Sequence, residues 1–162
     1  MTTSPDLGFL LRHPAHCVAL GFGSGLAPKA PGTVGTLVGL PLFALLMLLP
    51  DIAHLPMIAL LFLVGIPLCS NAGDALGVSD HGSIVWDEIV AMMLVLEFTP
   101  SGAIWWLAAF LLFRLFDIWK PAPIRQCDAR LKGGFGVMFD DLLAALYAIA
   151  VLQALQWLMT RF

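Results

Sequence analysis

Four long apolar runs contain almost no charged residues, and they restrict the possible fold of this chain more than any other feature. They cover residues 37–49, 52–69, 103–119 and 142–159. Each run is apolar on all sides, without a polar stripe, and at about 1.5 Å per residue it makes roughly 20–27 Å of helix. That length approaches the ~30 Å hydrocarbon core of a bilayer. The runs therefore predict helices that lipid or protein encloses completely.

The composition favours lipid over a soluble core. Hydrophobic residues make up 60% of the chain and charged residues only 12%, against about 25% charged residues in soluble domains. We therefore expect an all-α fold, a compact multi-pass helical membrane bundle of about four to five apolar helices. The alternative is a soluble all-helical protein with a fully buried core. The length of 162 residues predicts one domain, with residues 1–20 as an N-terminal extension and residues 21–160 as the helical core.

The order of connectors predicts which end of the bundle is polar. If residues 84–98 form a fifth helix, the short turns "PDIAHLP" and "TPSG" lie on one face and the long connectors on the other. Most Lys and Arg residues then lie on the face of the long connectors, and by the positive-inside tendency this face is cytoplasmic. Most acids lie there too. We therefore expect a membrane protein whose polar site faces the cytoplasm.

Two adjacent acids, Asp87 and Glu88, begin the apolar segment "IVWDEIVAMMLVLEF". Consecutive residues of a helix point about 100° apart, so this pair can present carboxylates to two sides of a cleft. Favourable interaction with the helix dipole is the alternative explanation. Further acids are expected at the same depth, namely Asp74, Asp80, Asp117, Asp140 and Asp141. Because so many neighbouring carboxylates repel one another, they predict a hard divalent cation such as Mg²⁺.

Basic residues are expected beside these acids in "FRLFDIWKPAPIRQCD". Arg114 and Asp117 are spaced to pair at the end of an apolar helix, and a simple membrane-edge salt bridge is the alternative role. Pro121 ends that helix, and we expect an extended segment that carries Lys120 and Arg125 towards the acids. Acids that hold a metal next to bases that hold an anion indicate a phosphate-ester site.

Two further segments are candidate parts of the site. The stretch "GFGSGLAPKAPGTVGT" is expected to present backbone amides and the hydroxyls of Thr33 and Thr36 to a phosphate before the first helix. A flexible entry loop is the alternative, because the stretch lacks the ending of a P-loop. Asp140 and Asp141 are expected to open the last helix, where interaction with the helix dipole is again an alternative.

Four motifs together resemble the phosphatidylglycerophosphatase A family: "GFGSGLAPKAPGT", "DHGSIVWDE", "FRLFDIWKPAPIR" and "GGFGVMFDD". The resemblance implies an Mg²⁺-dependent phosphatase of the inner membrane that removes the terminal phosphate of phosphatidylglycerophosphate. It places the site on Thr33, Thr36, Asp80, Asp87, Glu88, Arg114, Asp117, Lys120, Arg125, Asp128, Asp140 and Asp141. The chain departs from the family pattern at Ala91, Ala122 and Ala129, and none of these positions is a candidate ligand.

The expected mechanism is hydrolysis by a metal-activated water. Asp87 and Glu88, with Asp140 or Asp141, are expected to hold Mg²⁺. Asp80 or Asp117 would orient the water, and Lys120 and Arg125 would bind the phosphate. A phosphoaspartyl intermediate remains an alternative.

Two other functions are compatible with part of the sequence. "DAR" and "GVMFD" partly match the CDP-alcohol phosphotransferases, although the leading Gly and the last Asp of that pattern are missing. A small metal-ion or proton transporter would also need acids near apolar helices, but towards the middle of each helix. No basic patch suited to nucleic acid is present. The expected partners are a phospholipid substrate and membrane lipid, and the sequence does not indicate an oligomeric state.

Overall fold

The computed structural model describes residues 5–161, and none of these residues forms a β-strand. Residues 1–4 of the expected N-terminal extension and residue 162 lie outside the described residues. The helical segments in chain order are α1 (Leu7–Arg12), α2 (Pro14–Ala19), the 3-10 segment η1 (Gly21–Leu26), α3 (Pro31–Leu46), the 3-10 segment η2 (Asp51–Ala53), α4 (His54–Leu76), α5 (Trp86–Glu97), α6 (Ala103–Trp119), α7 (Ile124–Arg130) and α8 (Gly133–Arg161). The all-α prediction is confirmed.

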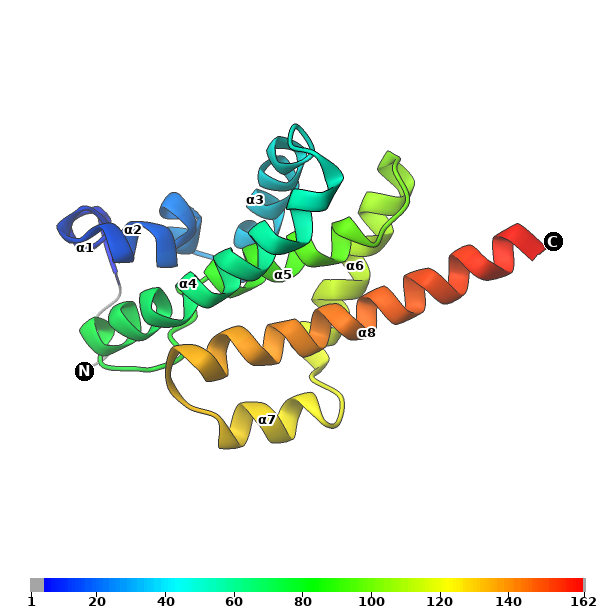
Figure 1. Ribbon diagram of the computed structural model, residues 1–162. Helices are drawn as coiled ribbons and strands as arrows, with labels where there is room; N and C mark the ends of the chain where they lie inside the picture. The colour runs from blue at the N-terminus through cyan, green and yellow to red at the C-terminus, as the bar shows by residue number, and fades with distance from the viewer. Residues whose placement is uncertain (1–4, 162) are drawn as a thin grey trace.

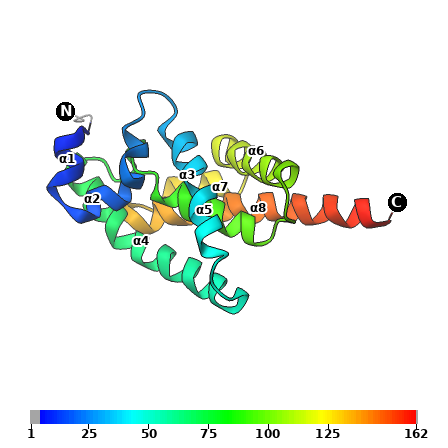
Figure 2. The same cartoon turned by 90° about the horizontal axis from the view of Figure 1, so that it is seen from above.

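Two of the described helical segments are long and apolar enough to cross a bilayer. They are Asp51–Leu76, which joins η2 to α4 over 26 residues, and Gly133–Arg161, which is α8 with 29 residues. At about 1.5 Å per residue both exceed a ~30 Å hydrocarbon core. Helix α8 runs along the length of the molecule and its last turns extend past the other helices (Figures 1 and 2).

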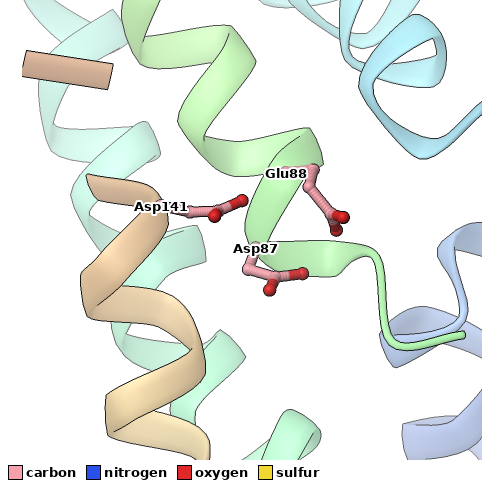
Figure 3. A group of neighbouring side chains, drawn as sticks. All are labelled: Asp87, Glu88 and Asp141. Carbon is pink, nitrogen blue, oxygen red and sulfur yellow. The ribbon is translucent and has the colours of Figure 1, made fainter. Parts of the chain in front are cut away.

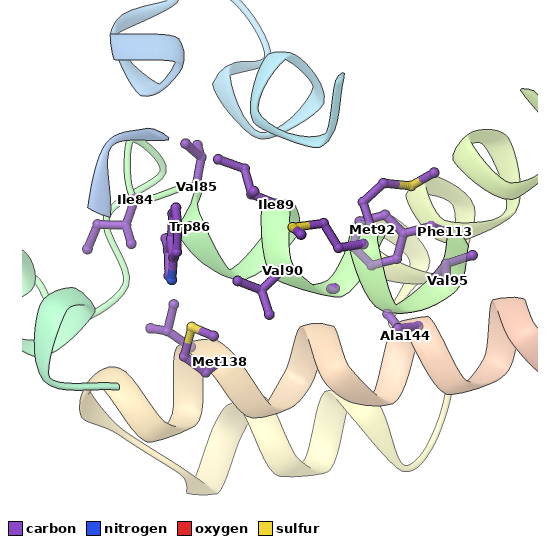
Figure 4. Packing of buried hydrophobic residues seen from close by; sticks show 14 of the residues in the cluster. Ile84, Val85, Trp86, Ile89, Val90, Met92, Val95, Phe113, Met138 and Ala144 are labelled. Carbon is purple, nitrogen blue, oxygen red and sulfur yellow. The ribbon is translucent and has the colours of Figure 1, made fainter. Parts of the chain in front are cut away.

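Helix α5 is the central element of the core. It contacts α3, α4, α6 and α8, and most of its side chains are buried. Figure 4 shows Ile89 and Met92 on the side of α5 facing α3, with Val90 on the side facing α8. A helix that protein surrounds in this way is apolar all round without touching lipid. Its 12 residues span only about 18 Å, and the helices that surround it make the fifth apolar segment a core helix.

The close contact between α4 and α8 explains where α8 begins. The apolar run predicts the last helix at residues 142–159, whereas α8 begins at Gly133. A Cβ at Gly134 would lie 1.9 Å from the carbonyl oxygen of Ile66. The Gly134 amide donates a hydrogen bond to the Ser70 hydroxyl at 2.9 Å. The first turns of α8 thus form where the backbone of α8 packs directly on the backbone of α4. A hydropathy pattern does not detect such a contact.

The connection after α6 is a turn and a short helix. Helix α6 covers the predicted residues 103–119, and it ends at Lys120 in a left-handed conformation with φ 45°. Residues 121–123 form a turn, and α7 follows with its first residue, Ile124, buried. The expectation of an extended segment through "PAPIR" was therefore wrong. Because Ile124 enters the core, α7 returns along α8.

The outer surface is strongly apolar. Helix α6 exposes a stripe at three- and four-residue spacing made of Ile104, Leu107, Leu111, Leu115 and Ile118. The outer face of α4 exposes Leu55, Leu60, Leu63 and Val64. Large apolar patches on a protein surface indicate contact with a membrane or with another protein.

Candidate metal and phosphate site

Three carboxylates from two helices lie together at the centre of the candidate site. Asp87 and Glu88 occupy the first turn of α5 and Asp141 lies on α8. One ligand oxygen from each lies within 4.8 Å of the other two, and Figure 3 shows the side chains directed into the same space. Asp140 and Asp141 do not open the last helix as predicted, because they lie about two turns after Gly133. They belong instead to the part of α8 that packs on α5.

The adjacent acids of α5 face different neighbours. The Glu88 carboxylate faces α3 and α6, where it lies beside Gly32 and Arg114. The Asp87 side chain lines a cavity whose walls come from α4, α5 and α8. This divergence follows from the rotation of about 100° between consecutive helix residues. Asp87 therefore faces the cavity between α4 and α8, while Glu88 faces Arg114 on a neighbouring side of α5.

Gly32 belongs to the site, although the sequence motifs did not predict it. A Cβ at this position would lie 2.2 Å from Glu88 Oε1 and 3.3 Å from Arg114 Nη1. Only a residue without a side chain allows the carboxylate to approach the first turn of α3. The available signal was the position of Gly32 next to Thr33 in "PGT", but a glycine carries no chemistry that identifies it as part of a site.

Arg114 contacts polar side chains of three helices, namely Glu88 of α5, Asp117 of its own helix α6 and Thr36 of α3. Its Nη1 atom lies 2.5 Å from Asp117 Oδ2 and 3.8 Å from Glu88 Oε1. The same Nη1 atom donates a hydrogen bond to the buried Thr36 hydroxyl at 3.4 Å, and that hydroxyl donates to the Gly32 carbonyl at 2.8 Å. The predicted pairing of Arg114 with Asp117 is confirmed. Thr36 acts in the structure as a contact between α3 and Arg114.

Lys120 forms a second charged cluster with Asp140 and Asp128. Its ammonium group pairs with Asp140 Oδ2 and lies 3.2 Å from Asp128 Oδ2. Burial lowers the pKa of Lys120, but the hydrogen bond with Asp140 and the charges of Asp140 and Asp128 outweigh it and raise the pKa above its usual value. Lys120 therefore stays positively charged at any physiological pH.

Buried oxygens of these acids lack protein donors. Among residues 5–161, the buried side-chain atoms without a hydrogen-bond partner are Asp87 Oδ1, Glu88 Oε2, Arg114 Nε, Asp140 Oδ1 and Asp141 Oδ2. All five atoms belong to this site. A buried polar atom without a partner is costly, and several buried carboxylates also repel one another. Hard carboxylate oxygens at short mutual distance are the ligands that Mg²⁺ prefers, so the donor set fits this ion.

The remaining predicted residues lie at the edge of the site. Thr33 is half-buried in the first turn of α3, and its amide donates to the Ala30 carbonyl. The prediction that Thr33 and Thr36 precede the first helix was therefore wrong, since α3 begins at Pro31. Arg125 is exposed on α7. Asp80 is exposed before α5 and, with Asp128, lines a small pocket of about 40 Å³.

The fold and the site define an all-helical protein with long apolar helices and a buried acidic centre, in which Arg114 pairs with Glu88 and Lys120 pairs with Asp140. A family model described as phosphatidylglycerophosphatase A matches residues 17–156. The chain belongs to the phosphatidylglycerophosphatase A family.

Individual relatives agree with this membership. The chain is 51% identical to a phosphatidylglycerophosphatase A from Haemophilus influenzae over 92% of this chain and 93% of the relative. It is 41% identical to a phosphatidylglycerophosphatase A from Escherichia coli over 88% and 83% of the two chains. A protein from Bacteroides thetaiotaomicron, provisionally named a phosphatidylinositol-3-phosphatase, is 37% identical over 86% and 92%. No solved structure matches the chain.

Proposed function

We propose that this chain is a phosphatidylglycerophosphatase, which hydrolyses the terminal phosphate of phosphatidylglycerophosphate to phosphatidylglycerol and inorganic phosphate. One observation carries the proposal. Buried carboxylates from α5 and α8 lie within 4.8 Å of one another; Arg114 pairs with one of them, Glu88, and Lys120 pairs with Asp140, which is next to Asp141 in the chain. The relatives named phosphatidylglycerophosphatase A supply the substrate class.

We propose Mg²⁺ as the cofactor. Asp87, Glu88 and Asp141 would hold the ion, because one oxygen of each lies within 4.8 Å of the other two. Asp140 is the fourth candidate ligand, although its Oδ2 atom is paired with Lys120. When bound, Mg²⁺ supplies charge neutralisation at the phosphoryl oxygens and acidifies a water. Without a cation the acids would repel a phosphate dianion from this site.

The basic residues would bind the phosphate and stabilise the charge that develops during hydrolysis. Lys120 can exchange its contact with Asp140 for a phosphate oxygen, since a single flexible side chain carries the ammonium group. Arg114 is held by Asp117 and Thr36, so its position is fixed before substrate arrives. The exposed Arg125 would meet the phosphate from the water side.

We propose Asp117, and not Asp80, as the general base that takes a proton from the attacking water. Its carboxylate is largely buried and pairs with the same guanidinium that faces Glu88, whereas Asp80 is exposed. In the reaction a bond forms between the water oxygen and phosphorus, and the bond between phosphorus and the glycerol oxygen breaks. The water proton passes to a carboxylate such as Asp117, and the glycerol oxygen takes a proton from solvent.

We also propose that the protein spans the bacterial inner membrane several times, as one domain of residues 1–162, with this site at the cytoplasmic boundary. The two long helical segments and the exposed apolar stripes of α4 and α6 support membrane insertion. The location fits the chemistry, because a phospholipid headgroup lies at the boundary between lipid and water while its tails remain in the bilayer.

The test is phosphate release from phosphatidylglycerophosphate in mixed micelles. Wild type, Asp87→Asn and Glu97→Gln are each assayed with Mg²⁺ and with EDTA, and Glu97 serves as an acid at the opposite end of α5. We expect metal-dependent release by wild type and Glu97→Gln and none by folded Asp87→Asn. Phosphatidylinositol 3-phosphate is assayed in parallel, because preference for it would assign a different headgroup. No release from either lipid would refute the proposed function.

A further inference from the structure

An apolar cavity adjoins the acidic centre through a single shared residue. It has a volume of about 400 Å³ and lies between α4, α5 and α8. Its walls include Ile58, Phe62, Val90, Leu94 and Met138. Asp87 is its one charged lining residue, and the same carboxylate lies within 4.8 Å of Glu88 and Asp141.

We propose that this cavity holds one acyl chain of the phospholipid substrate while the headgroup phosphate occupies the acidic centre. The proposal rests on the proposed function and extends it with a tail-binding subsite.

The chemistry of the walls selects a hydrocarbon chain. Apart from Asp87, the lining residues offer only aliphatic and aromatic side chains and Met138. A polar ligand would lose its hydrogen bonds to water here without replacing them, whereas an alkyl chain gains free energy in proportion to its buried area. The volume lies within the range of roughly 300–1,000 Å³ that is usual for small-molecule sites.

The position of the cavity provides a route from the bilayer to the acids. Leu55, Ala59 and Leu63 line one side from α4, and all three are exposed on the outer face of that helix. At the other side the cavity meets Asp87. A lipid can therefore enter sideways with its tail between α4 and α8 and its headgroup towards α5.

A second apolar groove supplies a matched control. It lies between α6 and the end of α8, with a volume of about 600 Å³, and Trp105, Ala108 and Leu155 line it. None of its lining residues belongs to the acidic centre. Any lipid can cover this groove, but its occupation has no connection to the reacting phosphate.

The experiment compares Ala59→Trp with Ala108→Trp. Each substitution places one bulky side chain into an apolar groove from a lining alanine. Hydrolysis of dioleoyl and dihexanoyl phosphatidylglycerophosphate is measured in mixed micelles, and the readout is the ratio of the two kcat/KM values. We expect Ala59→Trp to lower the long-chain to short-chain ratio at least about tenfold, because losing a few buried methylene groups changes affinity by that factor. Ala108→Trp should leave the ratio unchanged.

A direct readout accompanies the kinetics. Phosphatidylglycerophosphate with a photoactivatable diazirine in one acyl chain should label peptides of α4 and α8 in wild type and lose that labelling in Ala59→Trp. Equal ratios for the two variants, or labelling that Ala59→Trp does not reduce, would overturn the tail subsite while hydrolysis itself continued. If wild type hydrolyses neither lipid, the proposed function fails instead.

Discussion

Replacing Gly32 by alanine should lower the catalytic rate without lowering the stability of the fold. The added Cβ would lie 2.2 Å from Glu88 Oε1, and an ordinary contact of this kind begins at 3.4 Å. The Glu88 carboxylate must therefore move by about 1 Å. It ends a flexible side chain, so the movement costs little folding free energy, and alanine in a helix is roughly 0.5–1 kcal/mol more favourable than glycine.

The expected loss is in catalysis. A displacement of about 1 Å in a catalytic group lowers the rate on the order of 100-fold, which corresponds to about 2.7 kcal/mol in the activation free energy. The assay is phosphate release from phosphatidylglycerophosphate, combined with thermal unfolding of the same preparations in detergent. Gly32→Ala should keep or raise the unfolding temperature while kcat falls about 100-fold.

Two further variants test whether the loss of activity comes from the contact between the new methyl group and Glu88. In Gly39→Ala the new Cβ meets the Ile89 carbonyl oxygen and the Met92 side chain at 3.0 Å. This disturbs α3 against α5 about two helix turns from Gly32 and touches no carboxylate, so kcat should stay near wild type. In a Glu88→Asp background the shorter acid leaves room for the methyl group, so adding Gly32→Ala should cost little more. Activity of Gly32→Ala within twofold of wild type would refute the steric argument, as would fully additive losses in the double variant.

Three further outcomes follow from the charged groups. Asp141→Asn should abolish Mg²⁺-dependent phosphate release yet raise the unfolding temperature in EDTA, because it removes repulsion among buried carboxylates; a lower unfolding temperature would contradict this reasoning. Lys120→Met should lower the free energy of unfolding by about 3–5 kcal/mol, because Asp140 loses its buried partner, and denaturant titration in detergent measures this. Glu97→Gln removes a charge 3.0 Å from His54, far along α5 from the acids, and should lower the unfolding temperature with kcat unchanged; a large loss of kcat would show that the site extends further.

Sequence patterns predicted the elements that depend on hydropathy. The bounds of α6 agree with residues 103–119, and the pairing of Arg114 with Asp117 followed from their spacing. The approach of Asp87, Glu88 and Asp141 agrees with the expectation that acids from separate motifs gather. These features are local or repeat at the helix period, so the sequence contains them directly.

The missed features depend on tertiary contacts. Helix α8 begins at Gly133 because Gly134 packs on the backbone of α4, and hydropathy alone placed its start after Asp141. Gly32 matters through the space that it leaves for Glu88. Helix α5 is apolar because protein surrounds it, and a single sequence cannot distinguish that environment from lipid.

The central claim is that Asp87, Glu88 and Asp141 together bind a divalent cation. The most direct measurement is a Mn²⁺ titration followed by electron paramagnetic resonance, with Mn²⁺ replacing Mg²⁺, on purified wild type and Asp141→Asn in detergent. The account predicts that wild type binds the ion and that Mg²⁺ displaces it, while the folded variant loses this binding. Equal binding by both proteins, or an active wild type that binds no ion, would contradict the account.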